Sequence, residues 1–185
     1  MKKSIVFILF FSIVFCGFSQ TERKHGIGLD LFDLAILHTI DVTYEYVGKK
    51  NWGFGLTARY CFDSDNIYIT DVDEKYSFTP FVRYYFTNKQ DFGSKGFYVE
   101  SFLKGFGYES YRYKYDYDCY YCEIYDRRKR KNDFDVAFGV GLGFKHISNN
   151  GFVLDLNLGL GRPLGISDNY YDIVGRGSIL IGYCF

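Results

Sequence analysis

Hydrophobic and polar residues alternate with period two over long stretches of this chain. Over 152–160 every second residue is Phe or Leu, and the residues between them include Asp155 and Asn157. Over 134–144 a row of Phe, Val and Leu alternates with a row that is rich in glycine. Strict alternation over about ten residues is typical of a β-strand, and no segment shows a convincing helical period. The pattern predicts eight strands, over 25–33, 40–47, 52–62, 78–86, 97–112, 134–144, 152–160 and 173–185.

The connections between the predicted strands alternate between short and long. Tight turns are predicted at 48–51 and 148–151, from their Gly and Asn content, and 88–96 is a slightly longer turn. Long polar loops are predicted near 63–75, 113–132 and 163–172. The connection near His38 is the exception, because the order of short and long connections would make it long, whereas it is short. The chain shows no internal repeat and no linker, so we predict one domain of up-and-down antiparallel strands.

Composition supports an ordered, strand-rich domain. The chain has 185 residues, 22% of them aromatic, with 20 glycines and only 2 prolines. Aromatic residues favour strands, and this composition excludes a disordered chain. The 22 basic residues balance the 22 acidic ones, which argues against a general nucleic-acid-binding protein.

Residues 1–19 have the features of a secretory signal peptide. Lys2 and Lys3 give a positive start, 5–15 is almost wholly apolar, and Gly17 and Ser19 are the small residues that precede a cleavage site. The apolar run is shorter than the roughly 20 residues that a membrane-spanning helix needs. We therefore predict cleavage after Ser19 and a mature domain over 20–185.

Alternation alone does not decide which face of the sheet meets water. A soluble, lipocalin-like carrier of apolar ligands has its apolar face inside, whereas a membrane barrel turns that face to lipid. Long strands and frequent glycine on the charged face favour the membrane barrel, because glycine leaves room for large polar side chains in a narrow lumen. The predicted fold is all-β, an eight-stranded antiparallel up-and-down transmembrane β-barrel. Aromatic residues predicted to form its two interfacial girdles are Trp52, Tyr60, Phe62, Tyr84, Phe86 and Tyr183.

The polar faces of the strands then point into the lumen. They carry six acidic and five basic side chains, namely Asp30, Asp41, Glu45, Glu100, Asp135 and Asp155 with Arg59, Arg83, Lys104, Lys145 and Arg176. Unpaired charges in a closed interior cost several kcal/mol each, so the near balance predicts an ion-pair network. Eight strands leave room only for side chains or one small ligand. We therefore predict a filled lumen without an open pore, a metal or a cofactor.

Four segments carry a family resemblance: GLDLFDLAILHTIDVTYEYV (28–47), FTPFVRYYFT (78–87), GFYVESFL (96–103) and GVGLGFKHISNNGFVLDLNLGLGRPLG (139–165). They resemble the small outer-membrane β-barrel proteins of Gram-negative bacteria, also called porin-family or outer-membrane β-barrel-domain proteins. The terminal residues Ile181, Tyr183 and Phe185 resemble the signal read by the barrel-assembly machinery. The resemblance implies an outer-membrane location in a Gram-negative bacterium, with outer-membrane lipid and lipopolysaccharide around the barrel and the long loops outside the cell. It transfers no catalytic residue.

The segment near 113–132 is the most unusual part of the chain. Tyrosine occupies every second position over 111–117, at Tyr111, Tyr113, Tyr115 and Tyr117. A basic run closes the segment, at Arg127, Arg128, Lys129, Arg130 and Lys131. One hypothesis is an exposed arm that binds an extracellular protein or polysaccharide through tyrosine contacts, cations or a strand edge. The other is a solvated hairpin whose basic run pairs with lipopolysaccharide phosphates, and like-charge runs favour this second hypothesis.

The cysteines favour a disulfide over a metal site. Cys119 and Cys122 form a lone C-x-x-C pair, and in an oxidising compartment such a pair predicts a local disulfide rather than zinc. Cys61 and Cys184 are expected at opposite ends of the barrel, too far apart for a bridge. Cys61 instead remains an alternative partner for the loop cysteines.

The chain is predicted not to be an enzyme. The alternative is an outer-membrane lipid-modifying enzyme, which needs a nucleophile and a base at the outer rim. The predicted topology places His38 there, with Asp33, Asp41 and Ser64 as conceivable partners, but the spacing fixes no geometry among them.

Overall fold

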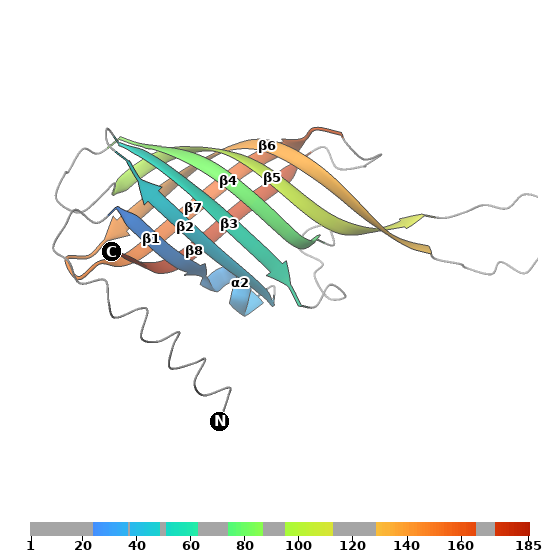
Figure 1. Cartoon of the computed structure of the whole chain (residues 1–185), viewed down its shortest axis with the longest axis horizontal. Coiled ribbons are helices and arrows are strands. Elements are labelled where there is room, and N and C mark those ends of the chain that lie inside the picture. The colour runs from blue at the N-terminus through green and yellow to red at the C-terminus, as the bar shows by residue number, and fades with distance from the viewer. Residues whose placement is uncertain are drawn as a thin grey trace, which may run out of the picture.

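The chain forms a closed barrel of eight antiparallel strands, as the sequence predicted (Figure 1). The computed structural model describes residues 24–36, 38–48, 51–62, 74–86, 95–112, 129–165 and 173–185, and at 36, 109–112 and 129–131 only the backbone. Its elements are β1 (His25–Asp30), α2 (Leu31–Ile36), β2 (Thr39–Val47), β3 (Trp52–Cys61), β4 (Glu74–Tyr85), β5 (Gly96–Arg112), β6 (Lys129–Ile147), β7 (Phe152–Pro163) and β8 (Val174–Cys184). Each strand pairs with the next, and β1 pairs with β8 to close the barrel.

Up-and-down topology divides the barrel into two ends. At the turn end, β2, β4, β6 and β8 finish, and a short turn at 148–151 joins β6 to β7. At the loop end, β1, β3, β5 and β7 finish, and α2 connects β1 to β2. The seam between β1 and β8 is locked at the turn end, where the backbone groups of His25 and Phe185 exchange two hydrogen bonds of 3.1 and 2.8 Å.

The prediction of a strand over 25–33 is wrong in its second half. β1 ends at Asp30, and Leu31–Ile36 forms the helix α2, which packs against both β2 and β8. The cause is local: the Asp30 carboxylate accepts the backbone N–H groups of Phe32 at 2.9 Å and Asp33 at 3.2 Å, as an N-cap does. The helix therefore completes the wall of the barrel where β1 stops, and it lengthens the connection near His38.

Three strands also extend into segments predicted as loops. Glu74 and Lys75 belong to β4, 129–132 to β6 and Pro163 to β7, and the remaining parts of these loops lie mostly outside the described residues. β6 pairs with β5 as far as Arg112–Lys129, whereas its pairing with β7 ends at Ala137–Pro163. Among the described residues, 109–112 and 129–132 therefore pair as strands only with each other, and we call this two-stranded extension the ribbon (Figure 1).

The two faces of the wall have opposite chemistry. Along β7 exposed and buried residues alternate without a break from Phe152 to Gly161, and the buried positions include Asp155 and Asn157. The exposed positions from Phe152 to Leu160 are Phe and Leu. The charged face therefore points inward and the apolar face outward.

Candidate functional site

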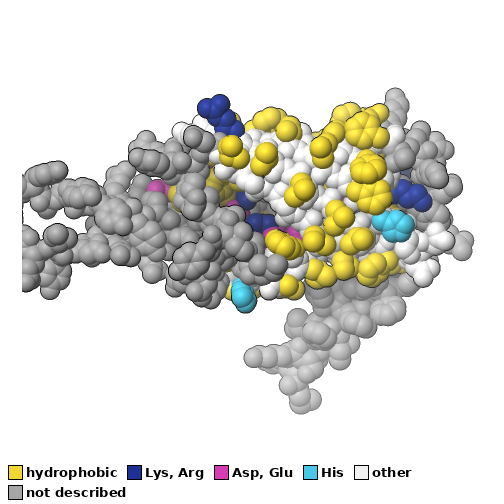
Figure 2. Space-filling model, turned by 180° about the vertical axis from the view of Figure 1, so that it is seen from behind, with side chains coloured by type: hydrophobic (Ala, Val, Ile, Leu, Met, Phe, Trp, Pro, Cys, Tyr) yellow, Lys and Arg dark blue, Asp and Glu magenta, His cyan; other side chains and the backbone are white. Residues whose placement is uncertain are grey.

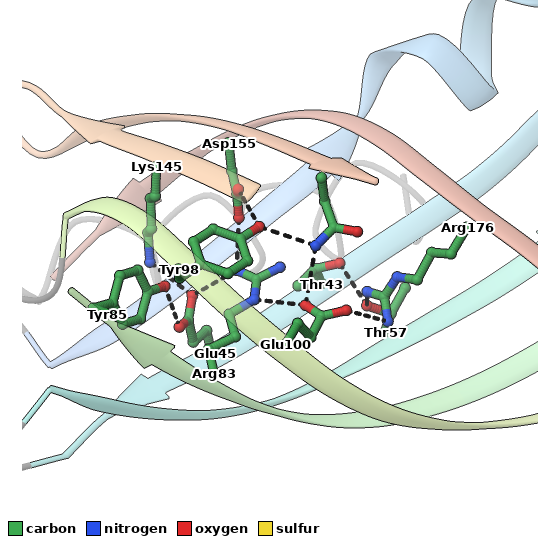
Figure 3. Close-up of polar contacts among 11 residues, drawn as sticks. Thr43, Glu45, Thr57, Arg83, Tyr85, Tyr98, Glu100, Lys145, Asp155 and Arg176 are labelled. Carbon is green, nitrogen blue, oxygen red and sulfur yellow. Dashed lines mark hydrogen bonds and ion pairs between the residues drawn. The ribbon is translucent and has the colours of Figure 1, made fainter. Parts of the chain in front are cut away.

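Arg83 is the centre of a charged cluster that fills the middle of the lumen (Figure 3). Its Nε donates a hydrogen bond to Glu100 at 2.7 Å, and its Nη1 donates to Glu45 at 3.1 Å and to Asp155 at 2.6 Å. All four side chains are buried, and they come from β4, β2, β5 and β7. One guanidinium thus joins carboxylates from three other strands.

Two further cations complete this central cluster. Lys145 Nζ donates to Glu45 at 2.7 Å, and Arg176 lies 3.2 Å from Glu100 and donates to the hydroxyl of Thr57 at 2.9 Å. The cluster therefore holds three cations and three carboxylates. Equal numbers of opposite charges are what a buried network needs to avoid an isolated ion.

Neutral side chains bind the remaining carboxylate oxygens. The hydroxyl of Tyr85 donates to Glu45 at 2.6 Å, and that of Tyr98 donates to Asp155 at 2.6 Å. Asn157 donates to the Tyr98 hydroxyl at 3.1 Å. Together with the ion pairs, these contacts connect β2, β4, β5, β6, β7 and β8. β3 joins the cluster through Thr57, whose hydroxyl accepts from Arg176.

Aromatic rings pack around the cations. The Arg83 guanidinium lies 4.4 Å from the centre of the Phe81 ring and 4.3 Å from that of Tyr98. Arg176 lies 5.3 Å from the Phe81 ring and 5.4 Å from the Phe102 ring. Such contacts stabilise a desolvated cation by about 2 kcal/mol. The rings also occupy the lumen volume that a pore would require.

Glycines on the inner face make room for these large side chains. A Cβ at Gly139 would collide with the Phe102 ring, and one at Gly143 would collide with the Tyr98 ring. Along the strand register, Gly141 and Gly159 separate Glu100 from Arg176. Because neither has a side chain, Arg176 can approach Glu100 across the lumen.

A second cluster lies towards the loop end. Arg59 binds two carboxylates, Asp41 on β2 at 3.0 Å and Asp33 on α2. Lys104 on β5 binds Glu74 on β4 at 2.6 Å. This loop-end cluster ties α2 to the barrel wall through a single arginine.

The structure gives Asp30 a different role from an ion pair. Its Oδ1 accepts the N–H groups at the start of α2 and also the backbone N–H of Ile179 on β8, at 3.3 Å. Asp30 therefore ends the β1–β8 ladder and starts the helix. Asp135 is fully buried, and its Oδ1 accepts the N–H of Val136 at 2.7 Å.

Of the eleven predicted lumen charges, the structure brings nine into these two clusters. Sequence reasoning missed their partners Asp33, Glu74, Tyr85 and Tyr98. The two tyrosines occupy inward positions of the predicted strands, so the alternation held the signal for them. If the strand continued beyond Asp30, the side chain of Asp33 would point outward. The helix α2, which begins at Leu31, brings it inside.

Asp33→Asn is expected to remove a pH dependence of stability. Burial raises the pKa of Asp33 from its ordinary 3.8 to about 6, although Arg59 opposes this shift. The folded state therefore holds the proton more tightly than the unfolded state. The resulting stabilisation is complete below about pH 3.8 and is lost as the pH rises through about 6, which amounts to on the order of 1 kcal/mol between about pH 5 and 7.5. Urea unfolding at the two pH values measures the difference.

The exposed Ala35 on the same helix supplies the control for this experiment. Ala35→Ser is expected to keep the pH dependence of the wild type. An Asp33→Asn variant with an unchanged difference between the two pH values would contradict the role given to Asp33.

Figure 2 shows hydrophobic side chains spread over the outer wall. Aromatic residues lie at both ends of this wall. Exposed aliphatic side chains occupy its middle, among them Leu29, Val99, Leu103, Val140, Leu142, Leu154, Leu156 and Leu158. At the turn end Trp52, Tyr84 and Phe86 contact in sequence, with ring centres 5.1 and 5.8 Å apart. At the loop end the rings of Tyr60 and Phe62 are 5.4 Å apart. Among the described residues no helix has the length and apolar character to cross a membrane.

The terminal residues predicted as the assembly signal lie along the seam. Ile181 pairs with Leu29, and Tyr183 with Ile27, across the β1–β8 junction. The Phe185 ring stacks on His25, with ring centres 5.9 Å apart. Phe185 therefore contributes to the closure of the barrel.

The candidate partner-binding residues fall at or beyond the tip of the ribbon. The register pairs Tyr111 with Arg130, and Ser110 with Lys131. The other residues of this group, at 113, 115, 117, 127 and 128, lie outside the described residues, as do Cys119 and Cys122 and the predicted signal peptide. Cys61 ends β3 at the loop end and Cys184 ends β8 at the turn end.

No enzymatic arrangement forms around His38 in the described part of the chain. Its conceivable partners Asp33 and Asp41 both bind Arg59, and Ser64 lies outside the described residues. Within the same described residues, no group of His, Cys, Asp and Glu has the arrangement of a metal site.

No protein-family model and no curated protein sequence matches the chain. Among solved structures, the chain is similar to the outer membrane protein Ail of Yersinia pestis, a backbone structure in phospholipid bilayer nanodiscs. The identity is 18%, the alignment covers 89% of this chain and 100% of that chain, and the TM-score is 0.45. The eight-stranded barrel described above rests on the strand pairing of this chain.

Proposed function

We propose that this chain is an integral outer-membrane β-barrel of a Gram-negative bacterium that acts outside the cell through its ribbon and loop-end connections. The observation that carries the proposal is the inversion of the wall, with apolar side chains exposed outside and charges buried inside. A barrel surrounded by water would have to expose this whole apolar belt, whereas lipid solvates it.

The height of the apolar wall suits a bilayer. The outward row of β7 runs without interruption from Phe152 to Leu160. Nine residues at about 3.4 Å each, tilted by about 40°, span about 20 Å, close to the apolar band of roughly 25 Å on membrane barrels. The next outward residue is the exposed Arg162, at the loop end. A cation at this boundary suits the phosphates of lipopolysaccharide, the lipid partner that we propose.

The filled lumen argues for a structural or binding role rather than passive transport. Arg83, its carboxylates and the stacked rings occupy the middle of the barrel. A lipocalin-like carrier would need an apolar interior, and this interior is charged. In planar bilayers we expect no large, steady channel openings, and such openings would contradict the filled lumen.

The ribbon provides a surface for a partner. Its strands continue beyond the last β4–β5 and β6–β7 pairs, at Glu74–Tyr108 and Ala137–Pro163. Strand edges without a neighbour can bind an extended chain, and tyrosines with cations suit acidic polymers. We propose an extracellular protein or acidic polysaccharide as the partner, and propose that the chain is not an enzyme. The barrel-assembly machinery would insert the barrel through the seam strand β8.

Neutralising the basic run tests the partner-binding surface. In cells that express the full chain, the variant changes all five residues of 127–131 to Gln, and the probe is immobilised heparin, an acidic polysaccharide. We expect at least tenfold weaker cell binding for this variant, and weaker binding of the wild type at high salt, since salt screens exposed charges.

A matched control separates this surface from general cell charge. Arg162→Gln removes a cation from the outer wall and is expected to leave heparin binding unchanged. Equal binding by the wild type and the 127–131 variant would reject the polysaccharide partner. Lipid A profiles that change on deletion of the gene would instead favour a lipid-modifying enzyme.

A further inference from the structure

A small cavity lies beside the central cluster, under β1. Its volume is about 20 Å³, and its lining includes Glu45, Arg83, Lys145 and Asp155 together with Gly26 and Gly28. A cavity of roughly 10–15 Å³ or more on this measure holds one water molecule, so the space suits one water rather than a larger ligand.

Lys145 has unused hydrogen-bonding capacity at this cavity. Its side chain is 3% exposed, and among the described residues its ammonium has one hydrogen-bond acceptor, Glu45 at 2.7 Å. An ammonium carries three N–H donors, and a buried charged donor without an acceptor loses its hydration without compensation. A ligand that accepts from Lys145 would supply this compensation.

The ligand must also suit the carboxylates that line the same space. Asp155 binds Arg83 and Tyr98, and Glu45 binds Lys145, Arg83 and Tyr85. Glu45 Oε2 already accepts from both Lys145 and Arg83. Glu45 Oε1 and the two Asp155 oxygens each accept one of these hydrogen bonds, and each has a second lone pair for a further one. A cation would be repelled by Lys145 and Arg83, and an anion by Glu45 and Asp155. A neutral molecule that both accepts and donates has no such conflict.

The missing side chain at Gly26 leaves space beside Lys145. A Cβ at this position would lie 3.9 Å from Lys145 Nζ and 3.3 Å from Cys184 Sγ. The β1 backbone at Gly26 therefore does not contact the ammonium directly. Figure 3 shows Lys145, Glu45, Arg83 and Asp155 gathered around the same part of the lumen.

From this geometry we infer that the barrel holds one ordered water molecule that accepts a hydrogen bond from Lys145 and donates to the carboxylates of the central cluster. The water is a structural component of the network, because it completes the solvation of a buried ammonium. This inference holds for the barrel in any surroundings, so it does not depend on the proposed outer-membrane function.

A crystal structure of the purified full chain at better than about 1.8 Å tests the site, since water bound by several groups is ordered. We expect one density peak at hydrogen-bond distance from Lys145 Nζ and from a carboxylate oxygen of Glu45 or Asp155. A well-ordered cluster without such a peak overturns the inference. Crystals grown in bromide would show anomalous signal at the site if an anion bound there, which would also overturn it.

A variant pair tests whether the space beside Gly26 is required. Gly26→Ala brings a methyl group towards Lys145 and is expected to remove the density peak, while Lys145 keeps its contact with Glu45. Gly177→Ala, on the exposed face of β8, is expected to retain the peak. If the Gly26 variant does not fold, the wild-type density map still decides between water, ion and no ligand.

Discussion

Gly182→Ala is expected to prevent the barrel from closing. Gly182 pairs with Gly28 across the β1–β8 seam. A Cβ at this position would collide with the carbonyl oxygen of Ile27 and lie 2.8 Å from Gly28 Cα. These are backbone atoms of the paired strand, so they cannot move aside without breaking the seam. Overpacking of side chains that can adjust costs about 1–3 kcal/mol, and a collision with the backbone of the paired strand costs more because the pairing itself must break.

The fraction of protein that remains folded in an unboiled gel sample measures this effect. We expect at least tenfold less folded barrel for Gly182→Ala than for the wild type. Gly177 lies on the same strand, and the nearest neighbour of a Cβ there would be Leu158 at 3.5 Å, an ordinary contact. Gly177→Ala is therefore expected to fold normally, and equal folding of the two variants would contradict the packing described for the seam.

Arg83→Met is expected to destabilise the barrel by about 3–5 kcal/mol. The change removes the cation that Glu45, Glu100 and Asp155 share, and breaking a buried ion pair on one side leaves uncompensated charge. Methionine keeps much of the side-chain volume, so the loss reports mainly on charge. Urea unfolding in detergent or lipid vesicles measures it.

Two further variants make the measurement specific. The outward-facing Arg162→Met is expected to change the free energy of unfolding by less than about 0.5 kcal/mol. Adding Asp155→Asn to Arg83→Met removes one of the stranded carboxylates and is expected to recover part of the lost stability. A loss below about 0.5 kcal/mol for Arg83→Met alone would show that the central cluster is not held together by this arginine.

Period-two alternation predicted the strands. Together with their length and the glycines on the charged face, it also predicted the barrel and the face on which each of the eleven predicted lumen charges lies. It assigned Arg83, Glu100 and Asp155 to the inside, and the structure joins them directly. It did not predict which strands bring them together, because alternation gives the face of a residue but not its partner across the lumen. Alternation also does not give the position of the Phe102 ring over Gly139, which depends on the register between the neighbouring strands β5 and β6.

The loop end shows where alternation fails. The N-cap at Asp30 replaces the second half of the first predicted strand with a helix and turns Asp33 towards Arg59. A cap depends on one side chain and two N–H groups, and this signal is weaker than a row of apolar residues. Glu74 was assigned to a loop because the hydrophobic pattern begins only after it. Backbone pairing with Tyr108 nevertheless places it in β4, where its carboxylate binds Lys104.

A heat-modifiability gel on membrane fractions tests the outer-membrane barrel most directly. The full chain is expressed in a Gram-negative host, and boiled and unboiled samples of each fraction are compared. The apolar wall predicts that the protein is recovered with the outer membrane, and that the closed barrel changes mobility on boiling. Recovery as a soluble periplasmic protein with no mobility shift would contradict the membrane assignment of the apolar face.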